Sequence, residues 1–304
     1  MIDIDQLDEK FSIEGEVGFA ELENDLIFLT VSNKYADVDI CLYGAHITSF
    51  RPHNSGDLLW MSPESFFEEG KAIRGGIPVC FPWFGPHQTE PQLPQHGFAR
   101  LMYWDVVETA SLSSAETKVV LQLCSSEATK VYWPHDFCAT LTVIAGSVLK
   151  VTLAVTNTSG IAFDYTCALH SYFNLSAIEN LRIEGLQHTE YYNQLSGEKG
   201  LQEEEILEIT EPMTRHYLDT EAPVVMDDTI FKRRVRVAKA GSRTTTVWNP
   251  GAETSAAIAD LPDDGFETFI CVETVNAFND VISLAPGDVH ETTTMIGLVE
   301  YPVS

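Results

Sequence analysis

A histidine and a glutamate in apolar surroundings are the side chains of this sequence that could do chemistry together. His170 lies in LHSYFNL (169–175) at the end of an apolar run, and Glu273 lies in FICVETVNAFND (269–280). A carboxylate among strand residues is costly to bury unless it is paired or used. An ion pair with an arginine, or a position that faces solvent, is the commoner reason for such a residue. If His170 and Glu273 act together, they supply general acid–base catalysis.

A stretch rich in proline, glycine and aromatic residues, from Lys71 to Trp104, holds the other polar candidates. Its five prolines exclude an ordinary helix, and it is too apolar for a disordered linker. Long ordered loops of this kind usually serve a site, although the same loop could simply cover the core. Its polar side chains are suited to a small polar or anionic ligand, and they include Arg74, Gln95, His96 and Arg100.

Other common chemistries lack their sequence signatures. The chain contains no GxSxG elbow, no HExxH pair, no zinc knuckle, no P-loop and no GxGxxG. RGG at 74–76 is too short to count as a phosphate-binding loop. We therefore expect no metal and no cofactor, and a histidine–glutamate pair remains as the chemical apparatus.

Strand-like segments at roughly ten-residue spacing must position these side chains. Val38, Ile40 and Leu42 alternate with polar or small neighbours, which is typical of a half-buried strand. The segment 231–239 alternates basic and apolar residues and also predicts a strand, whereas 61–70 predicts a short helix. No linker or repeat interrupts the pattern. We predict one all-β domain, residues 1–304, built as a large β-sandwich with one or two short helices.

Charge and cysteine content restrict the partners and the compartment. The formal net charge of −27 argues against nucleic acid, and no segment resembles a membrane span or a signal peptide. An anionic substrate would need a local basic cluster, for which Arg74 and Arg100 are candidates. The six cysteines show no paired spacing. We expect them to be buried thiols in a protein of the reducing cytoplasm.

Five motifs in order resemble a known family. RGGIPVCFPWFG, LPQHGFAR, LHSYFNL, VWNP and VETVNA look like those of the glucose-6-phosphate 1-epimerases, or hexose-6-phosphate mutarotases. The resemblance runs from about Gly44 to the C-terminus. It implies a large antiparallel β-sandwich of the galactose mutarotase-like type and an isomerase of the aldose 1-epimerase group. It also implies a sugar phosphate as the ligand, and we expect a monomer.

The resemblance implies a role for each candidate residue. His170 would be the catalytic acid and Glu273 the catalytic base, while Arg74, Gln95 and Arg100 would bind substrate and His96 would face the sugar ring. Interconverting anomers requires a proton to leave the C1 hydroxyl while another reaches the ring oxygen. An ionised glutamate and a protonated histidine near neutral pH would do this without a cofactor.

One position departs from the family pattern. EPMTRHY (211–217) places Thr214 where the family often carries a substrate-binding aspartate in TDR-x-Y. Thr214 can hydrogen-bond a hydroxyl but carries no charge, so the preference among sugars could differ. Asp219 could substitute if the segment were shifted.

Other functions compete with a hexose-6-phosphate 1-epimerase. An aldose 1-epimerase for unphosphorylated sugars would not need both Arg74 and Arg100. A non-catalytic sugar-phosphate-binding protein could lose either His170 or Glu273. A glycoside hydrolase would normally call for two carboxylates, and only one can be placed.

Overall fold

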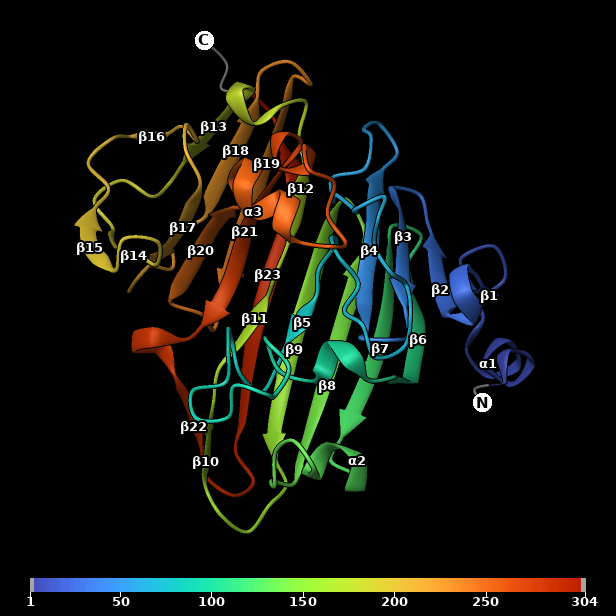
Figure 1. The fold of residues 1–304 in the computed structure, drawn as a ribbon. Helices are drawn as coiled ribbons and strands as arrows, with labels where there is room; N and C mark the ends of the chain where they lie inside the picture. The colour runs from blue at the N-terminus through green and yellow to red at the C-terminus, as the bar shows by residue number, and fades with distance from the viewer. Residues whose placement is uncertain (1–2, 302–304) are drawn as a thin grey trace.

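Alternating side chains along the long strands build the core. In β8 (Phe137–Ala145), every second side chain is buried between the sheets. The computed structural model describes residues 3–301, which form two large and two small antiparallel sheets (Figure 1). Val38 and Ile40 are fully buried, as the alternation predicts. The prediction of an all-β antiparallel sandwich is confirmed.

The larger sheet has nine strands and forms one layer of the sandwich. The segment 231–239 lies in it as the predicted strand. In spatial order its strands are β16 (Ile206–Leu207), β13 (Leu181–Glu184), β18 (Val224–Asp228), β19 (Arg233–Ala240), β23 (Val289–Val299), β9 (Val148–Asn157), β8, β7 (Glu116–Cys124) and β6 (Asp105–Ser113).

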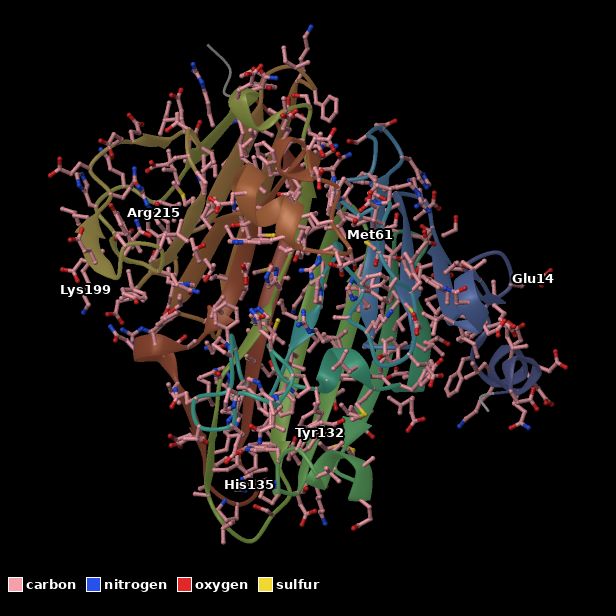
Figure 2. All side chains as sticks on the ribbon, in the orientation of Figure 1. Glu14, Met61, Tyr132, His135, Lys199 and Arg215 are labelled. Carbon is pink, nitrogen blue, oxygen red and sulfur yellow. A yellow bond between two sulfur atoms is a disulfide. The ribbon has the colours of Figure 1, made fainter. Side chains whose placement is uncertain are left out.

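The second large sheet carries the candidate site. Its strands in spatial order are β15 (Glu198–Leu201), β14 (Glu190–Asn193), β17 (Met213–Tyr217), β20 (Thr244–Asn249), β21 (Phe269–Asn276), β11 (Cys167–Leu169) and β5 (Val79–Cys80), with β12 (Tyr172–Asn174) also paired to β21. Every residue of β21 is buried. The outer strands reach an edge of the molecule, where Lys199 and Arg215 lie opposite Glu14 at the other edge (Figure 2).

Two smaller sheets complete the fold. The four-stranded sheet lies beside α1 at one side of the molecule (Figure 1). A bridge between Ile47 and Ile77 joins it to the long loop. The small sheets contain β1 (Val17–Glu21), β2 (Ile27–Ser32), β3 (Ala36–Cys41) and β4 (His46–Pro52), and then β10 (Phe163–Tyr165) with β22 (Ile282–Leu284).

Residues 3–301 contain three short α-helices, whereas one or two were expected. Asp3 caps α1 by accepting hydrogen bonds from the amides of Asp5 and Gln6. None of the described helices is long and apolar enough to cross a membrane. The helices are α1 (Ile4–Phe11), α2 (Glu127–Lys130) and α3 (Gly251–Ala257), with 3₁₀ turns η1 (Glu23–Asp25), η2 (Ala99–Leu101), η3 (Ile178–Asn180), η4 (Gly265–Glu267) and η5 (Phe278–Asp280).

Two local predictions are wrong. Residues 61–70 form turns instead of a helix, because Met61 pairs with Gly75 and the Ser62 hydroxyl donates to Asp260 O. Cys124 and Cys138 are not free thiols, since they lie directly opposite each other on β7 and β8 and form a disulfide. The remaining cysteines are buried and unpaired, as expected: Cys41, Cys80, Cys167 and Cys271.

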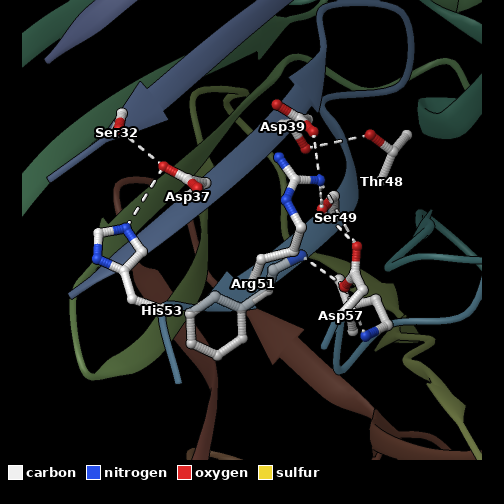
Figure 3. Close-up of polar contacts among 10 residues, drawn as sticks. Ser32, Asp37, Asp39, Thr48, Ser49, Arg51, His53 and Asp57 are labelled. Carbon is white, nitrogen blue, oxygen red and sulfur yellow. Dashed lines mark hydrogen bonds and ion pairs between the residues drawn. The ribbon is translucent and has the colours of Figure 1, made fainter. Parts of the chain in front are cut away.

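A polar cluster around Asp57 holds the segment that follows β4 against this strand (Figure 3). The Asp57 carboxylate accepts from the Ser49 hydroxyl at 2.5 Å and from the amides of Phe50 and Leu59 at 3.0 and 2.9 Å. Arg51 lies 3.0 Å from the Asp39 carboxylate. These contacts fix where the chain leaves the small sheet and enters the segment that leads to the site.

Gly97 allows the long loop to fold back onto itself beside His96. Its φ is +74°, and its neighbour Phe81 forms a parallel bridge with it. A Cβ on residue 97 would collide with the Phe81 carbonyl oxygen, whereas a Cβ on Gly85, at φ +80°, would meet nothing within 4 Å. Gly97 therefore combines a left-handed backbone with a close backbone approach.

Replacing Gly97 by alanine should strongly destabilise the protein. We expect Gly97→Ala to lower the free energy of unfolding by about 3 kcal/mol, because the strain of a positive φ adds to the collision. Gly85→Ala is the matched control and should cost about 1–2 kcal/mol, from the backbone alone. Urea unfolding of both variants tests this, and equal losses would contradict the close-approach explanation.

Candidate active site

One cavity gathers the candidate residues that are far apart in the chain. It has a volume of about 350 Å³ and lies over β17, β20 and β21. All the predicted site residues line it: Arg74, Gln95, His96, Arg100, His170, Thr214 and Glu273. The long loop contributes one wall and the second large sheet contributes the floor.

The predicted acid and base are in contact. Glu273 is 2% exposed on the fully buried β21, and His170 follows β11, which pairs with β21. His170 Nε2 lies 3.4 Å from Glu273 Oε1. The His170 ring stacks on Tyr172 with centroids 4.9 Å apart, and this contact holds the orientation of the imidazole. The pair is therefore held ready on rigid strands.

Burial changes the expected protonation of this pair. Desolvation, followed by the charges of Arg100 and Arg74, lowers the pKa of His170 to about 3. Burial raises the pKa of Glu273 well above its ordinary value. Burial works against the expected charged histidine beside an ionised glutamate, because it favours the neutral form of both groups. The pair then holds one proton, and that proton rests on Glu273.

His96 presents a neutral imidazole to the cavity. Burial, followed by the charges of Arg100 and His170, lowers the His96 pKa well below its ordinary value. The amide of Gly85 donates to His96 Nδ1 at 3.1 Å, so the ring proton is on Nε2. The ring meets that of His170 edge to face at 5.5 Å. His96 Nε2 also lies 3.2 Å from the side-chain amide of Gln95, so these two groups form a polar pair beside the predicted acid.

The two arginines of the cavity are not equivalent. Asp260 Oδ1 accepts from Nε and Nη2 of Arg74 at 3.1 and 3.0 Å, and Arg74 Nη1 lies 3.3 Å from the Tyr172 hydroxyl. Arg100 donates from Nη2 to Gln95 O at 2.8 Å, and its buried Nε has no partner among the described residues. Arg100 therefore carries the less compensated positive charge.

Comparisons with known proteins show the family of the chain. A family model described as aldose 1-epimerase matches residues 28–297. The chain belongs to the aldose 1-epimerase family. A Salmonella typhimurium protein named "Putative glucose-6-phosphate 1-epimerase" is 35% identical over 254 residues, which is 84% of this chain and 84% of that protein. The prediction of an epimerase is confirmed.

Solved structures of aldose 1-epimerase relatives share the fold. The crystal structure of a "putative mutarotase" from Salmonella typhimurium has a TM-score of 0.89 and 32% identity, with 96% of each chain covered. A galactose mutarotase-like protein from Clostridium acetobutylicum has a TM-score of 0.74 at 15% identity, covering 94% of this chain and 98% of that one. The predicted galactose mutarotase-like sandwich is confirmed.

Only some of the aromatic residues in the long loop and in the LHSYFNL and VWNP motifs reach the cavity. Phe84 and Tyr172 line it, together with Trp248 of the VWNP motif. The Trp83 indole instead donates to Pro94 O at 2.9 Å, and Phe173 is buried in the core. These last two side chains therefore pack the protein and do not contact a ligand in the cavity.

Several residues of the epimerase cavity were not predicted from the sequence. Asp219 is not a substitute for the family aspartate, because it is exposed and pairs with Arg243 at 2.5 Å. Thr214 does line the cavity, and alternation along β17 puts His216 on the same face. That period-two spacing was the available signal for His216. Gln194, Thr246, Thr254 and Ile258 also line the cavity without having been predicted, and Asp260 acts behind Arg74.

Removing the buried carboxyl should make stability less dependent on pH. Above about pH 4.5 the unfolded chain releases the Glu273 proton while the folded protein retains it, so the free energy of unfolding falls with rising pH. We expect Glu273→Gln to gain stability over wild type by up to about 1.4 kcal/mol per pH unit above this point.

Urea unfolding from pH 4 to 8 measures this difference. Glu198→Gln, at an exposed position on β15, is the control and should follow the wild-type curve. A Glu273→Gln difference that stays constant with pH would contradict the raised pKa of Glu273.

Proposed function

We propose that the protein interconverts the α and β anomers of a hexose 6-phosphate, with glucose 6-phosphate the main substrate, and needs no cofactor. The contact between His170 and Glu273 inside a cavity that also holds Arg100 carries this proposal. The printed name of the Salmonella typhimurium relative supports the phosphorylated substrate.

The reaction needs one proton to leave the sugar and one to arrive. Glu273 as a carboxylate takes the proton of the C1 hydroxyl, and protonated His170 delivers a proton to the ring oxygen as the bond from that oxygen to C1 breaks. The open aldehyde turns about its C1–C2 bond. Closure onto the other face of the carbonyl reverses both transfers, so the enzyme regains its starting state.

A proton shift within the pair produces this reactive form. Moving the shared proton from Glu273 to His170 across their 3.4 Å contact gives carboxylate and imidazolium without changing the charge of the site. After burial, the charges of Arg100 and Arg74 are what lower the His170 pKa most. A bound phosphate dianion neutralises those charges and so favours the protonated histidine. Binding of the phosphate thus activates the acid.

The phosphate is assigned mainly to Arg100. An uncompensated buried guanidinium offers charge-assisted hydrogen bonds, and it attracts a dianion despite a net charge of −27. Arg74, fixed by Asp260, supports the same end of the cavity. Gln95, His96 and Thr214 bind sugar hydroxyl groups.

We also propose that the chain acts as a single domain, residues 1–304, and as a monomer in the cytoplasm. One apolar core includes residues from Phe11 to Ile296, which supports a single domain. Four unpaired thiols and a phosphorylated metabolite support the compartment, whereas the Cys124–Cys138 disulfide is uncommon there. Light scattering on the purified protein tests the oligomeric state.

Anomer exchange by NMR tests the reaction. The wild type should accelerate exchange of glucose 6-phosphate over the spontaneous rate far more than that of glucose. Glu273→Gln should lose at least about a hundredfold in kcat, because it can no longer take the C1 proton. Exchange no faster than the spontaneous rate, with the phosphate ester still bound, would show a binding protein. Equal rates on both sugars would show an epimerase for free aldoses.

Kinetics of Arg100→Met test the phosphate contact. Losing a charge-assisted hydrogen bond worth about 1.5–3 kcal/mol should raise KM for glucose 6-phosphate about 10–100-fold, with little effect on glucose. Arg182→Met, at an exposed position on β13, is the control and should behave as wild type. If Arg100→Met raises KM equally for glucose 6-phosphate and for glucose, Arg100 does not bind the phosphate.

A further inference from the structure

A row of polar side chains crosses the floor of the cavity. Register pairs His216 of β17 with Thr246 of β20, and Thr246 with Glu273 of β21. Gln194 lies beyond His216, and His170 lies beyond Glu273. All five side chains line the cavity. Gln194, His216 and Thr246 are called the threonine relay below.

The hydrogen bonds of the threonine relay run in one direction. His216 Nε2 lies 2.9 Å from Gln194 Oε1, a carbonyl oxygen that only accepts, so the ring proton is on Nε2. Burial lowers the His216 pKa to about 4, so the ring is neutral at pH 7 and Nδ1 is an acceptor. Thr246 lies 2.8 Å from Nδ1 and must therefore donate its hydroxyl proton to it. The Thr246 oxygen keeps its lone pairs for the cavity.

Packing holds the His216 ring in this orientation. The ring is 1% exposed, and the Phe278 ring lies over it with centroids 4.3 Å apart. Phe84 meets it edge to face at 6.0 Å, and Tyr192 stacks near it at 6.2 Å. The His216 ring therefore cannot rotate freely. Its Nδ1 stays beside Thr246, and the Thr246 oxygen remains an acceptor on the side of the cavity.

The order of groups along the floor matches the order of atoms in an aldose ring. His170 acts at the ring oxygen and Glu273 at the C1 hydroxyl. The third group in the row, Thr246, lies on the side of Glu273 away from His170. In the sugar, C1 is bonded to the ring oxygen on one side and to C2 on the other. A ring with its ring oxygen at His170 and its C1 hydroxyl at Glu273 thus directs its 2-hydroxyl toward Thr246.

We propose that the threonine relay accepts a hydrogen bond from the 2-hydroxyl of the sugar and makes the enzyme select aldose 6-phosphates that carry it. This inference rests on the proposed function and adds a specificity determinant to it. Thr214 on the same face of β17 lacks the charge of the family aspartate. The threonine relay supplies a polarised acceptor on that wall of the cavity.

Deleting the acceptor and the donor separately tests the pairing. In wild type, kcat/KM for 2-deoxyglucose 6-phosphate should be about tenfold below that for glucose 6-phosphate, because Thr246 loses its partner. In Thr246→Val the two substrates should react alike. Thr245→Val makes the same change on the same strand, where the cross-strand partner is Tyr217 instead of His216, and should keep the tenfold ratio.

Two further measurements separate the possible failures. If Thr246→Val does not fold, as judged by its thermal unfolding, His216→Leu removes the ring nitrogen that accepts the Thr246 proton and fixes its oxygen as an acceptor, and it should lower the ratio. An unchanged ratio in the folded variant would overturn the threonine relay while the epimerase activity stands. If the wild type accelerates neither substrate, the proposed function fails. Nitrogen NMR of His216 then still decides the relay, since a ring protonated on Nδ1 at pH 7 would contradict it.

Discussion

The burial of one carboxyl group is the constraint on which the site depends. Glu273 lies on a strand whose every residue is buried, so its charge cannot be stabilised by water. The nearest titratable partner is His170 at 3.4 Å, and it is as deeply buried. Burial disfavours the charged form of both Glu273 and His170, so the two groups share one proton in their neutral forms. The ionised pair forms only when a further charge in the cavity stabilises it. A substrate that brings negative charge to the arginines meets that requirement.

The two arginines of the cavity differ in how their positive charges are compensated. Two guanidinium groups in one small cavity would repel each other, and Asp260 compensates one of them. The remaining charge on Arg100 has no carboxylate within ion-pair distance among residues 3–301, so it is left for a ligand. A strongly acidic protein can in this way bind an anion without a broad basic surface.

The sequence indicated those parts of the site that lie in continuous motifs. His170, Glu273 and the residues of the long loop stood out because polar side chains interrupt apolar or proline-rich runs. His216 and Thr246 gave little signal, since their meaning depends on which strands pair and in which register, and such non-local contacts are not visible in a single sequence. The same reason explains the disulfide and the missing helix at 61–70. In both, a partner distant in the sequence decides the local structure.

The place of β21 in its sheet has a consequence for how the activity is lost. This strand pairs with β20 on one side and with β11 and β12 on the other, so its backbone amides are bonded on both sides. Such central strands exchange their amide hydrogens only when the whole molecule opens. Glu273 therefore sits in the part of the protein expected to exchange slowest, and we expect the site to be lost together with the fold.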